Sequence, residues 1–167
     1  MQNKDEIFKS VFFDYQDRIY RLVWSFLEDK NDLDDLFQSV LLKIWKNLDS
    51  FKNRSSLGTW IYRITVNTLI DFRRDKKRKQ DITLKMEIEN EKIQDEDQDI
   101  EQKMIKNERL EILNYCIKQL SLIDRTLIVL YLEELKYSEI ADVLGISEKN
   151  VSVKLARIKK KMNRMLR

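Results

Sequence analysis

Apolar residues recur along the first 80 positions with the spacing of helices. Over residues 5–28 they come alternately three and four positions apart, which places them on one face of a long amphipathic helix. A second helix is predicted over about 32–48, with Asp32 as its N-terminal cap. A third is predicted over about 57–76, where apolar residues surround most of the helix, so it should be mostly buried. The apolar positions of the three helices are, in order, Phe8, Val11, Phe12, Tyr15, Ile19, Leu22 and Phe26; Leu33, Phe37, Val40, Leu41, Ile44 and Leu48; and Trp60, Ile61, Ile64, Val66, Leu69 and Phe72.

The last 60 residues predict four shorter helices. They cover about 107–119, 121–133, 138–144 and 147 to the C-terminus. Ser121 and Asp124 have the spacing of a capping box, which marks the start of the second of them. Only Gly145 and Ile146 separate the last two helices. A tight joint that contains glycine, between two short helices, is typical of a helix-turn-helix.

The composition favours an all-α chain and excludes several classes of site. The 167 residues contain no proline and two glycines, too few for β-hairpins or for the glycine-rich loops that bind nucleotide phosphates. The chain has no histidine and one cysteine, Cys116, which excludes the usual zinc ligand sets, a Ser-His-Asp triad and an internal disulfide. We expect no enzymatic activity, no metal and no cofactor.

Charge divides the chain into three blocks. Residues 1–79 carry 16 basic and 12 acidic side chains, residues 80–108 carry 4 and 10, and residues 109–167 carry 12 and 7. The middle block has no aromatic residue and few large apolar ones, so it cannot bury enough surface to offset its ordering entropy. We therefore expect two small helical domains, 1–79 and 107–167, joined by a flexible acidic linker over 80–106. Its acidity either serves solubility or lets it cover the basic faces of the domains in place of phosphate.

The chain shows no targeting or membrane segment. Its first residues, MQNKDEIF, contain no apolar run of signal-peptide length, and no run approaches the roughly 20 residues of a membrane span. A lone reduced cysteine is tolerated inside the cell. We expect a cytoplasmic protein with no membrane insertion of its own.

The last predicted helix has two separate faces. Val151, Leu155, Ile158 and Met162 share one face, which should pack on the preceding helices. The other face carries side chains that contact base edges and phosphates in a DNA groove. They are Asn150, Val153, Lys154, Arg157 and Lys161. From Lys154 onward the chain has seven basic residues and no acidic one. The basic end alone also fits a solvated helix terminus whose cations complement the helix dipole.

Both remaining candidate surfaces lie in the first domain. On the second helix, a polar face also presents a leucine and a tryptophan, which is typical of a protein-docking surface. It consists of Asp35, Gln38, Leu42 and Trp45. The alternative is that Trp45 covers the edge of the core and that the carboxylates are ordinary charges at a helix N-terminus. On the third helix, Arg63, Asn67 and Arg74 fall on one side near Trp60, and the basic run from Arg73 to Lys79 follows. Cations and amides beside an aromatic ring suit single-stranded or opened DNA, although the basic run alone also fits a solvated helix end.

Three segments together resemble a known family. They are DLDDLFQSVLLKIW over 32–45, TWIYRITVNTLIDFRR over 59–74 and YSEIADVLGISEKNVSVKLARIKKKM over 137–162. In this order, and joined by a linker, they resemble a bacterial sigma factor of the extracytoplasmic-function (ECF) group of the sigma-70 family. The resemblance covers both domains, and only the connector is uninformative.

The resemblance implies a promoter-specificity subunit of RNA polymerase with two helical domains, region 2 and region 4. Residues 32–45 would dock on the clamp coiled coil of core polymerase, and region 4 would contact the polymerase flap. The minus-ten element would be read by Trp60, Arg63, Asn67, Arg73 and Arg74. The minus-thirty-five element would be read by Lys149, Asn150, Ser152, Val153, Lys154 and Arg157. The partners implied are core polymerase, promoter DNA and an anti-sigma factor.

Two other functions compete with this interpretation. A helix-turn-helix regulator that binds duplex DNA as a dimer would explain the second domain, but the chain has no dimerising heptad pattern and the docking face would have no use. A nuclease with a divalent metal on Asp32, Asp34 and Asp35 is disfavoured because adjacent carboxylates on a helix point in different directions.

Overall fold

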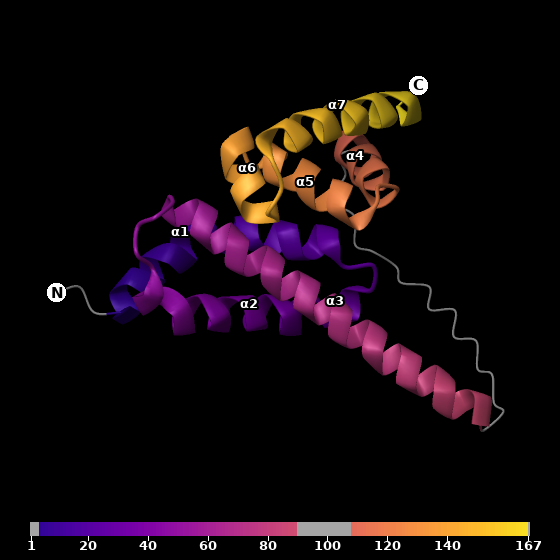
Figure 1. Cartoon of the computed structure of the whole chain (residues 1–167), viewed down its shortest axis with the longest axis horizontal. Helices are drawn as coiled ribbons and strands as arrows, with labels where there is room; N and C mark the ends of the chain where they lie inside the picture. The colour runs from indigo at the N-terminus through magenta and orange to yellow at the C-terminus, as the bar shows by residue number, and fades with distance from the viewer. Residues whose placement is uncertain (1–3, 90–107, 167) are drawn as a thin grey trace.

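The structure, a computed structural model, describes residues 4–89 and 108–166, and these residues are predominantly helical. Within these ranges there are seven α-helices, two short 3-10 helices and no strand, as the sequence predicts. They form two layers, with α1, α2 and α3 in one and α4 to α7 in the other (Figure 1). No helix in these ranges is long and apolar enough to cross a membrane.

The first domain is built on three long helices. These are α1 (Lys4–Phe26), α2 (Leu33–Asn47) and α3 (Leu57–Glu89), with the 3-10 helices η1 (Lys30–Asp32) and η2 (Leu48–Ser50) at the two ends of α2. Their apolar faces meet in a core that includes Ile19, Val40, Ile44, Ile61 and Leu69, all of them fully buried. The predicted stripes therefore point inward, and Leu36, which the sequence analysis omitted, joins them at 2 % exposure.

Two details of this domain differ from the sequence-based expectations. Asp32 stands at the start of α2 but makes no capping hydrogen bond; its carboxylate instead pairs with Lys76 Nζ at 2.7 Å. The long lysine side chain reaches across from α3, and the ion pair raises the pKa of Lys76. Helix α3 continues to Glu89, well past the predicted end near Lys76, because neither glycine nor proline interrupts a run of good helix formers. The rest of the predicted linker lies outside the described residues.

The second domain contains four short helices. They are α4 (Glu108–Lys118), α5 (Leu122–Leu132), α6 (Tyr137–Leu144) and α7 (Glu148–Met165). The hydroxyl of Ser121 accepts a hydrogen bond from Asp124 N and caps α5, as predicted. Gly145 lies in the left-handed region (φ 66°), and Ser147 caps α7 by accepting from Asn150 N. The joint between α6 and α7 is therefore the turn of a helix-turn-helix.

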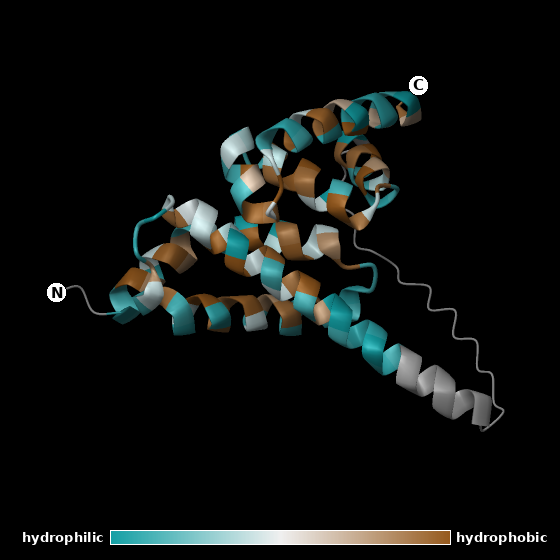
Figure 2. Ribbon diagram, in the orientation of Figure 1, coloured by the Kyte–Doolittle hydropathy of each residue, from teal (hydrophilic) through white to brown (hydrophobic). Residues whose placement is uncertain are grey.

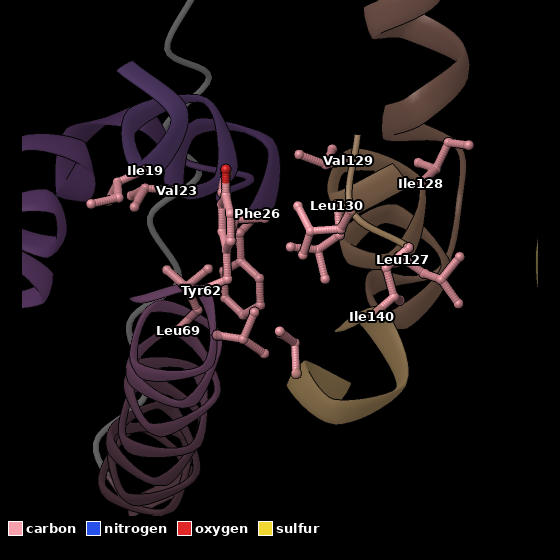
Figure 3. Close-up of a cluster of buried hydrophobic side chains, with 14 of the residues drawn as sticks. Ile19, Val23, Phe26, Tyr62, Leu69, Leu127, Ile128, Val129, Leu130 and Ile140 are labelled. Atoms are coloured by element: carbon pink, nitrogen blue, oxygen red, sulfur yellow. The ribbon is translucent and has the colours of Figure 1, made fainter. Parts of the chain in front are cut away.

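The two domains pack directly on each other. Helix α5 lies against α1 and α6 against α3 (Figure 1), and the ribbon of all four carries hydrophobic stretches (Figure 2). The buried residues of both domains belong to one continuous core. Figure 3 shows Phe26, Tyr62 and Leu69 on one side facing Leu130 and Ile140 on the other. Helix α5 is buried around most of its circumference because it packs on α7 on one side and on α1 on the other. The contacting surfaces of the two domains come from segments that are far apart in sequence, and this packed arrangement of the two domains is called the closed form below.

Candidate nucleic-acid and protein interfaces

The candidate docking face of α2 points to solvent, as predicted. Asp35 and Gln38 are exposed, Leu42 is 51 % exposed and Trp45 is 38 % exposed. Near the end of the helix, the indole Nε1 of Trp45 donates to the Asp5 carboxylate at 3.3 Å. Helix α1 thus fixes the orientation of the ring and leaves part of it uncovered. The result is an apolar patch with acidic and amide groups beside it.

A small open pocket lies between the end of α2 and the start of α3. It has a volume of about 220 Å³, and its lining includes Trp60 and Asn67 from α3 and Lys43 and Ser50 from the α2 side. The Trp60 ring packs on Phe51 with 5.2 Å between ring centroids. Two of the predicted minus-ten residues therefore share one pocket, with an aromatic wall, amide groups and a lysine.

The remaining minus-ten candidates are distributed differently from the prediction. Arg63 turns away from the pocket, and its guanidinium lies 3.6 Å from Asp142 of α6. Arg74 pairs with Asp71 one turn before it, at 2.8 Å. Arg73 lines a separate, larger groove of about 610 Å³ between the end of α1 and the middle of α3. The helical face that the sequence predicts is present, but the closed form does not bring its cations together.

The last helix separates its two faces as predicted. Val151, Leu155, Ile158 and Met162 are buried. The opposite side presents Lys149, Asn150, Ser152, Val153 and Arg157, all of them exposed. Lys154 is half-buried, with its Nζ 3.8 Å from Asp124 of α5. The exposed set lies in the first three turns of the second helix of a helix-turn-helix, where such helices contact base edges.

Comparison with known proteins identifies the family. The Sigma-70 region 2 model matches residues 12–79 and the Sigma-70, region 4 model matches residues 110–162. The ECF RNA polymerase sigma factor SigW of Bacillus subtilis is 30% identical over 97% of this chain and 90% of its own length. The chain belongs to the ECF sigma factors. Its function is promoter-specific initiation of transcription.

Other relatives and solved structures agree with this assignment. The RNA polymerase sigma factor SigV of Bacillus subtilis is 29% identical over 89% of this sigma factor. The fold is similar to that of the sigma factor RpoE in complex with the anti-sigma factor NepR from Bartonella quintana, with a TM-score of 0.78 and 21% identity over 96% of this chain and 97% of that one. It is also similar to CnrH in complex with the cytosolic domain of CnrY, with a TM-score of 0.68, 22% identity and coverage of 98% and 89%.

Several polar residues that sequence reasoning missed join region 2 to region 4 in this sigma factor. The Arg21 guanidinium donates to both carboxylate oxygens of Glu133, at 2.6 and 2.9 Å. The Thr59 hydroxyl donates to Glu139 at 3.2 Å. Arg125, which is 6 % exposed, donates to the Ser25 carbonyl at 3.3 Å. A signal for one of them was Arg125, a basic residue inside the mostly apolar segment LIDRTLIVLYL.

A cluster of cations surrounds Trp24 at the same interface. Lys30 Nζ lies 4.1 Å from the centroid of the Trp24 ring and Lys118 Nζ lies 5.1 Å from it. Lys30 also donates to the carbonyls of Trp24 and Leu27. Burial, together with the neighbouring charges of Lys118 and Arg125, lowers the pKa of Lys30 to about 8. Closure therefore places positive charges from both domains close together.

Proposed function

We propose that this sigma factor docks on the clamp coiled coil of core RNA polymerase through Asp35, Gln38, Leu42 and Trp45. The observation that carries the proposal is that α2 serves two surfaces at once. Leu42 and Trp45 lie on the exposed docking face, while Lys43, between them in sequence, lines the pocket that holds Trp60 and Asn67. Docking of α2 would therefore fix the pocket at a set position on the polymerase, where promoter DNA opens.

The minus-ten element is read on α3 in this proposal. An extruded base enters the pocket against Trp60 and Asn67, since bases stack on aromatic rings and amides hydrogen-bond base edges. Arg63, Arg73 and Arg74 neutralise phosphates of the opened strand. The protein traps unpaired bases and makes or breaks no covalent bond, so we propose no enzymatic activity and no cofactor.

The minus-thirty-five element is read by α7. Asn150 and Arg157 contact base edges, Val153 offers an apolar contact to a thymine methyl, and Lys149, Ser152 and Lys154 hold the backbone. The two elements lie roughly 25 base pairs apart, or about 85 Å of duplex. Helix α6 contacts both α3 and α7, so the two reading surfaces of the closed form are about two or three helix diameters apart, on the order of 30 Å. The closed form therefore cannot occupy both elements, and regions 2 and 4 must separate on the polymerase.

Two further partners follow from this proposal. Region 4 contacts the polymerase flap, and Leu110, Ile112 and Tyr115 of α4, which are 55 %, 48 % and 63 % exposed, are apolar side chains available for it. An anti-sigma factor holds the sigma factor inactive. The support is that a closed fold of this kind, with a TM-score of 0.78 over both domains, is found in a sigma factor bound to an anti-sigma factor. The protein acts in the cytoplasm, with the polymerase.

Co-elution with bacterial core polymerase on a sizing column tests the docking proposal. Physiological salt screens simple adhesion of a basic protein. We expect a one-to-one complex for the wild type and for Asp14→Ala, which removes an exposed acid of α1. Asp35→Ala with Gln38→Ala should weaken the complex at least about tenfold, the usual cost of removing important interface side chains. An unaffected double variant would contradict the α2 assignment, and a wild type that stays free would contradict the function.

The minus-thirty-five assignment has a separate test. Arg157→Ala should weaken initiation at a promoter that depends on this element and leave polymerase binding unchanged. Lys159→Ala is the matched control, because it removes the same charge from a side chain that is hydrogen-bonded to Tyr131 at 3.0 Å. Equal initiation by Arg157→Ala and the control would show that the recognition face is wrongly assigned.

A further inference from the structure

Helix α6 of region 4 places two carboxylates on one edge of α3. Glu139 Oε1 accepts from the Thr59 hydroxyl at 3.2 Å and from the Ser56 hydroxyl at 3.4 Å. Asp142 Oδ2 lies 3.6 Å from the Arg63 guanidinium. Ser56 directly precedes α3, and Thr59 and Arg63 lie in its first two turns; the three follow each other at spacings of three and four, so they form one donor row. Trp60 of the minus-ten pocket directly follows Thr59 in sequence.

The donor row has the chemistry of a phosphate site. Hydroxyl and guanidinium groups are the side chains that hold DNA phosphates, and a carboxylate presents the same kind of anionic oxygen to them. Thr59 is 3 % exposed, so the residue is almost completely shielded from solvent in the closed form. Within the described residues, the Asp142 carboxylate is the sole acidic group within 4 Å of the Arg63 guanidinium. The anionic partners of the row therefore come from the other domain.

We infer that Ser56, Thr59 and Arg63 form a phosphate-binding site for the opened promoter strand, and that Glu139 and Asp142 occupy it in the closed form. The inference rests on the proposed function of α3 and adds a regulatory contact to it. Region 4 competes with single-stranded DNA for region 2, so the free protein binds DNA weakly. On the polymerase, separation of the domains frees the donor row at the time when the strand arrives.

Glu139 also has a purely local role, and the experiment separates the two. Its second oxygen accepts from Lys136 N at 2.8 Å and so caps the start of α6, as an N3 glutamate does in a capping box. Glutamine serves equally well at that position of a capping box, so Glu139→Gln keeps the helix and removes the charge. Asp142→Asn does the same for the exposed carboxylate that faces Arg63. The double variant should fold like the wild type.

The test is fluorescence anisotropy of labelled single-stranded (dT)12 titrated with the full chain, without polymerase. Phosphate contacts carry no sequence information, so this probe suffices without knowledge of the promoter. Glu139→Gln with Asp142→Asn should bind about fivefold more tightly than the wild type, the scale of an exposed ion pair. The control Asp14→Asn with Glu111→Gln makes the same change in net charge away from α3 and should gain clearly less.

A third variant tests whether the gain in DNA affinity depends on Arg63. Adding Arg63→Ala to the Glu139→Gln, Asp142→Asn double variant should return the affinity to the wild-type value. If the double variant gains no more than its control, or if Arg63→Ala leaves the gain intact, the inference is wrong. Co-elution with core polymerase is measured on the same variants. Failure there for the wild type contradicts the proposed function, whereas intact co-elution without the gain in DNA affinity contradicts only the competition.

Discussion

The carboxylate of Glu133 accepts two hydrogen bonds from the guanidinium of Arg21, which precedes it by 112 residues. The Glu133 side chain is 9 % exposed, and a shielded bidentate pair is stronger than an ordinary surface ion pair. The pair lies between α1 of region 2 and the end of α5 in region 4, and it raises the pKa of Arg21. It is therefore a polar contact that depends directly on closure.

Charge reversal at this pair should open the protein. Arg21→Glu places two acids together and should weaken closure by about 1–2 kcal/mol or more, since a charge-assisted bidentate contact is lost. The radius of gyration from small-angle X-ray scattering should increase. Arg21→Glu combined with Glu133→Arg restores opposite charges and should recover the compact value. A double variant as extended as the single one would show that the pair does not contribute to closure.

The stability of the closed form should rise with pH above about 8. Lys30 has its pKa lowered from 10.5 to about 8, so between these values the folded protein binds fewer protons than the unfolded chain. The free energy of unfolding then increases with pH, by at most about 1.4 kcal/mol per unit. Below about pH 7 Lys30 is charged in both the folded and the unfolded state, so it causes no change of the free energy of unfolding with pH.

Urea denaturation between pH 7 and 9.5 measures this effect. Lys30→Met keeps the apolar stem over Trp24 and should abolish the increase, whereas Lys46→Met, at an exposed position on α2, should keep it. Burial raises the pKa of Tyr62 to about 12, which lowers stability only above pH 10 and stays outside the measured range. Parallel curves for the wild type and Lys30→Met would contradict the assignment.

Gly145→Ala should destabilise region 4 through the backbone alone. Gly145 has φ 66°, and an added Cβ would meet no atom within 4 Å. The cost is therefore the left-handed conformation itself, about 1 kcal/mol. Gly145→Asn should lose less, because asparagine adopts this region more readily. The free energies of unfolding of the two variants decide the point, and an equal loss for both would indicate a cause other than φ.

Local features were predictable from the sequence. The two faces of α7 follow from helical periodicity, and the caps of α5 and α7 follow from the serines that precede them. The exposure of Leu42 and Trp45 follows because the apolar stripe of α2 lies on the opposite side of the helix. Each of these depends on residues within a few positions of one another, so short-range rules suffice.

The relation between the domains was not predictable in the same way. Helix α5 is buried at every position from Thr126 to Leu130, so it must be covered on two sides. This pattern does not tell which helix covers the second side. The partner is α1, more than 90 residues away in sequence, and the match depends on the shapes of two surfaces. Packing of the two domains also brings Asp142 of α6 to Arg63, so Arg63 contacts Asp142 and does not line the minus-ten pocket. The positions of the candidate site residues therefore differ from those predicted by the helical wheel.

Arg125 stabilises the ends of two helices from different domains. Its guanidinium donates to the Ser25 carbonyl at the end of α1, and to the carbonyls of Lys118 and Leu120 at and after the end of α4, at 2.8 and 3.3 Å. A cation at these ends complements both helix dipoles and satisfies carbonyls that have no partner within their helices.

Arg125→Met fills similar space but leaves the buried carbonyls without a donor, and should lower the free energy of unfolding by about 2–4 kcal/mol. Arg125→Lys keeps the charge but has a single donor nitrogen, so its free energy of unfolding should lie between those of the wild type and Arg125→Met. Urea denaturation of the wild type and the two variants ranks their free energies of unfolding. Burial lowers the pKa of Arg125, so burying its charge has a cost. A methionine variant as stable as the wild type would show that this cost equals the contribution of the hydrogen bonds.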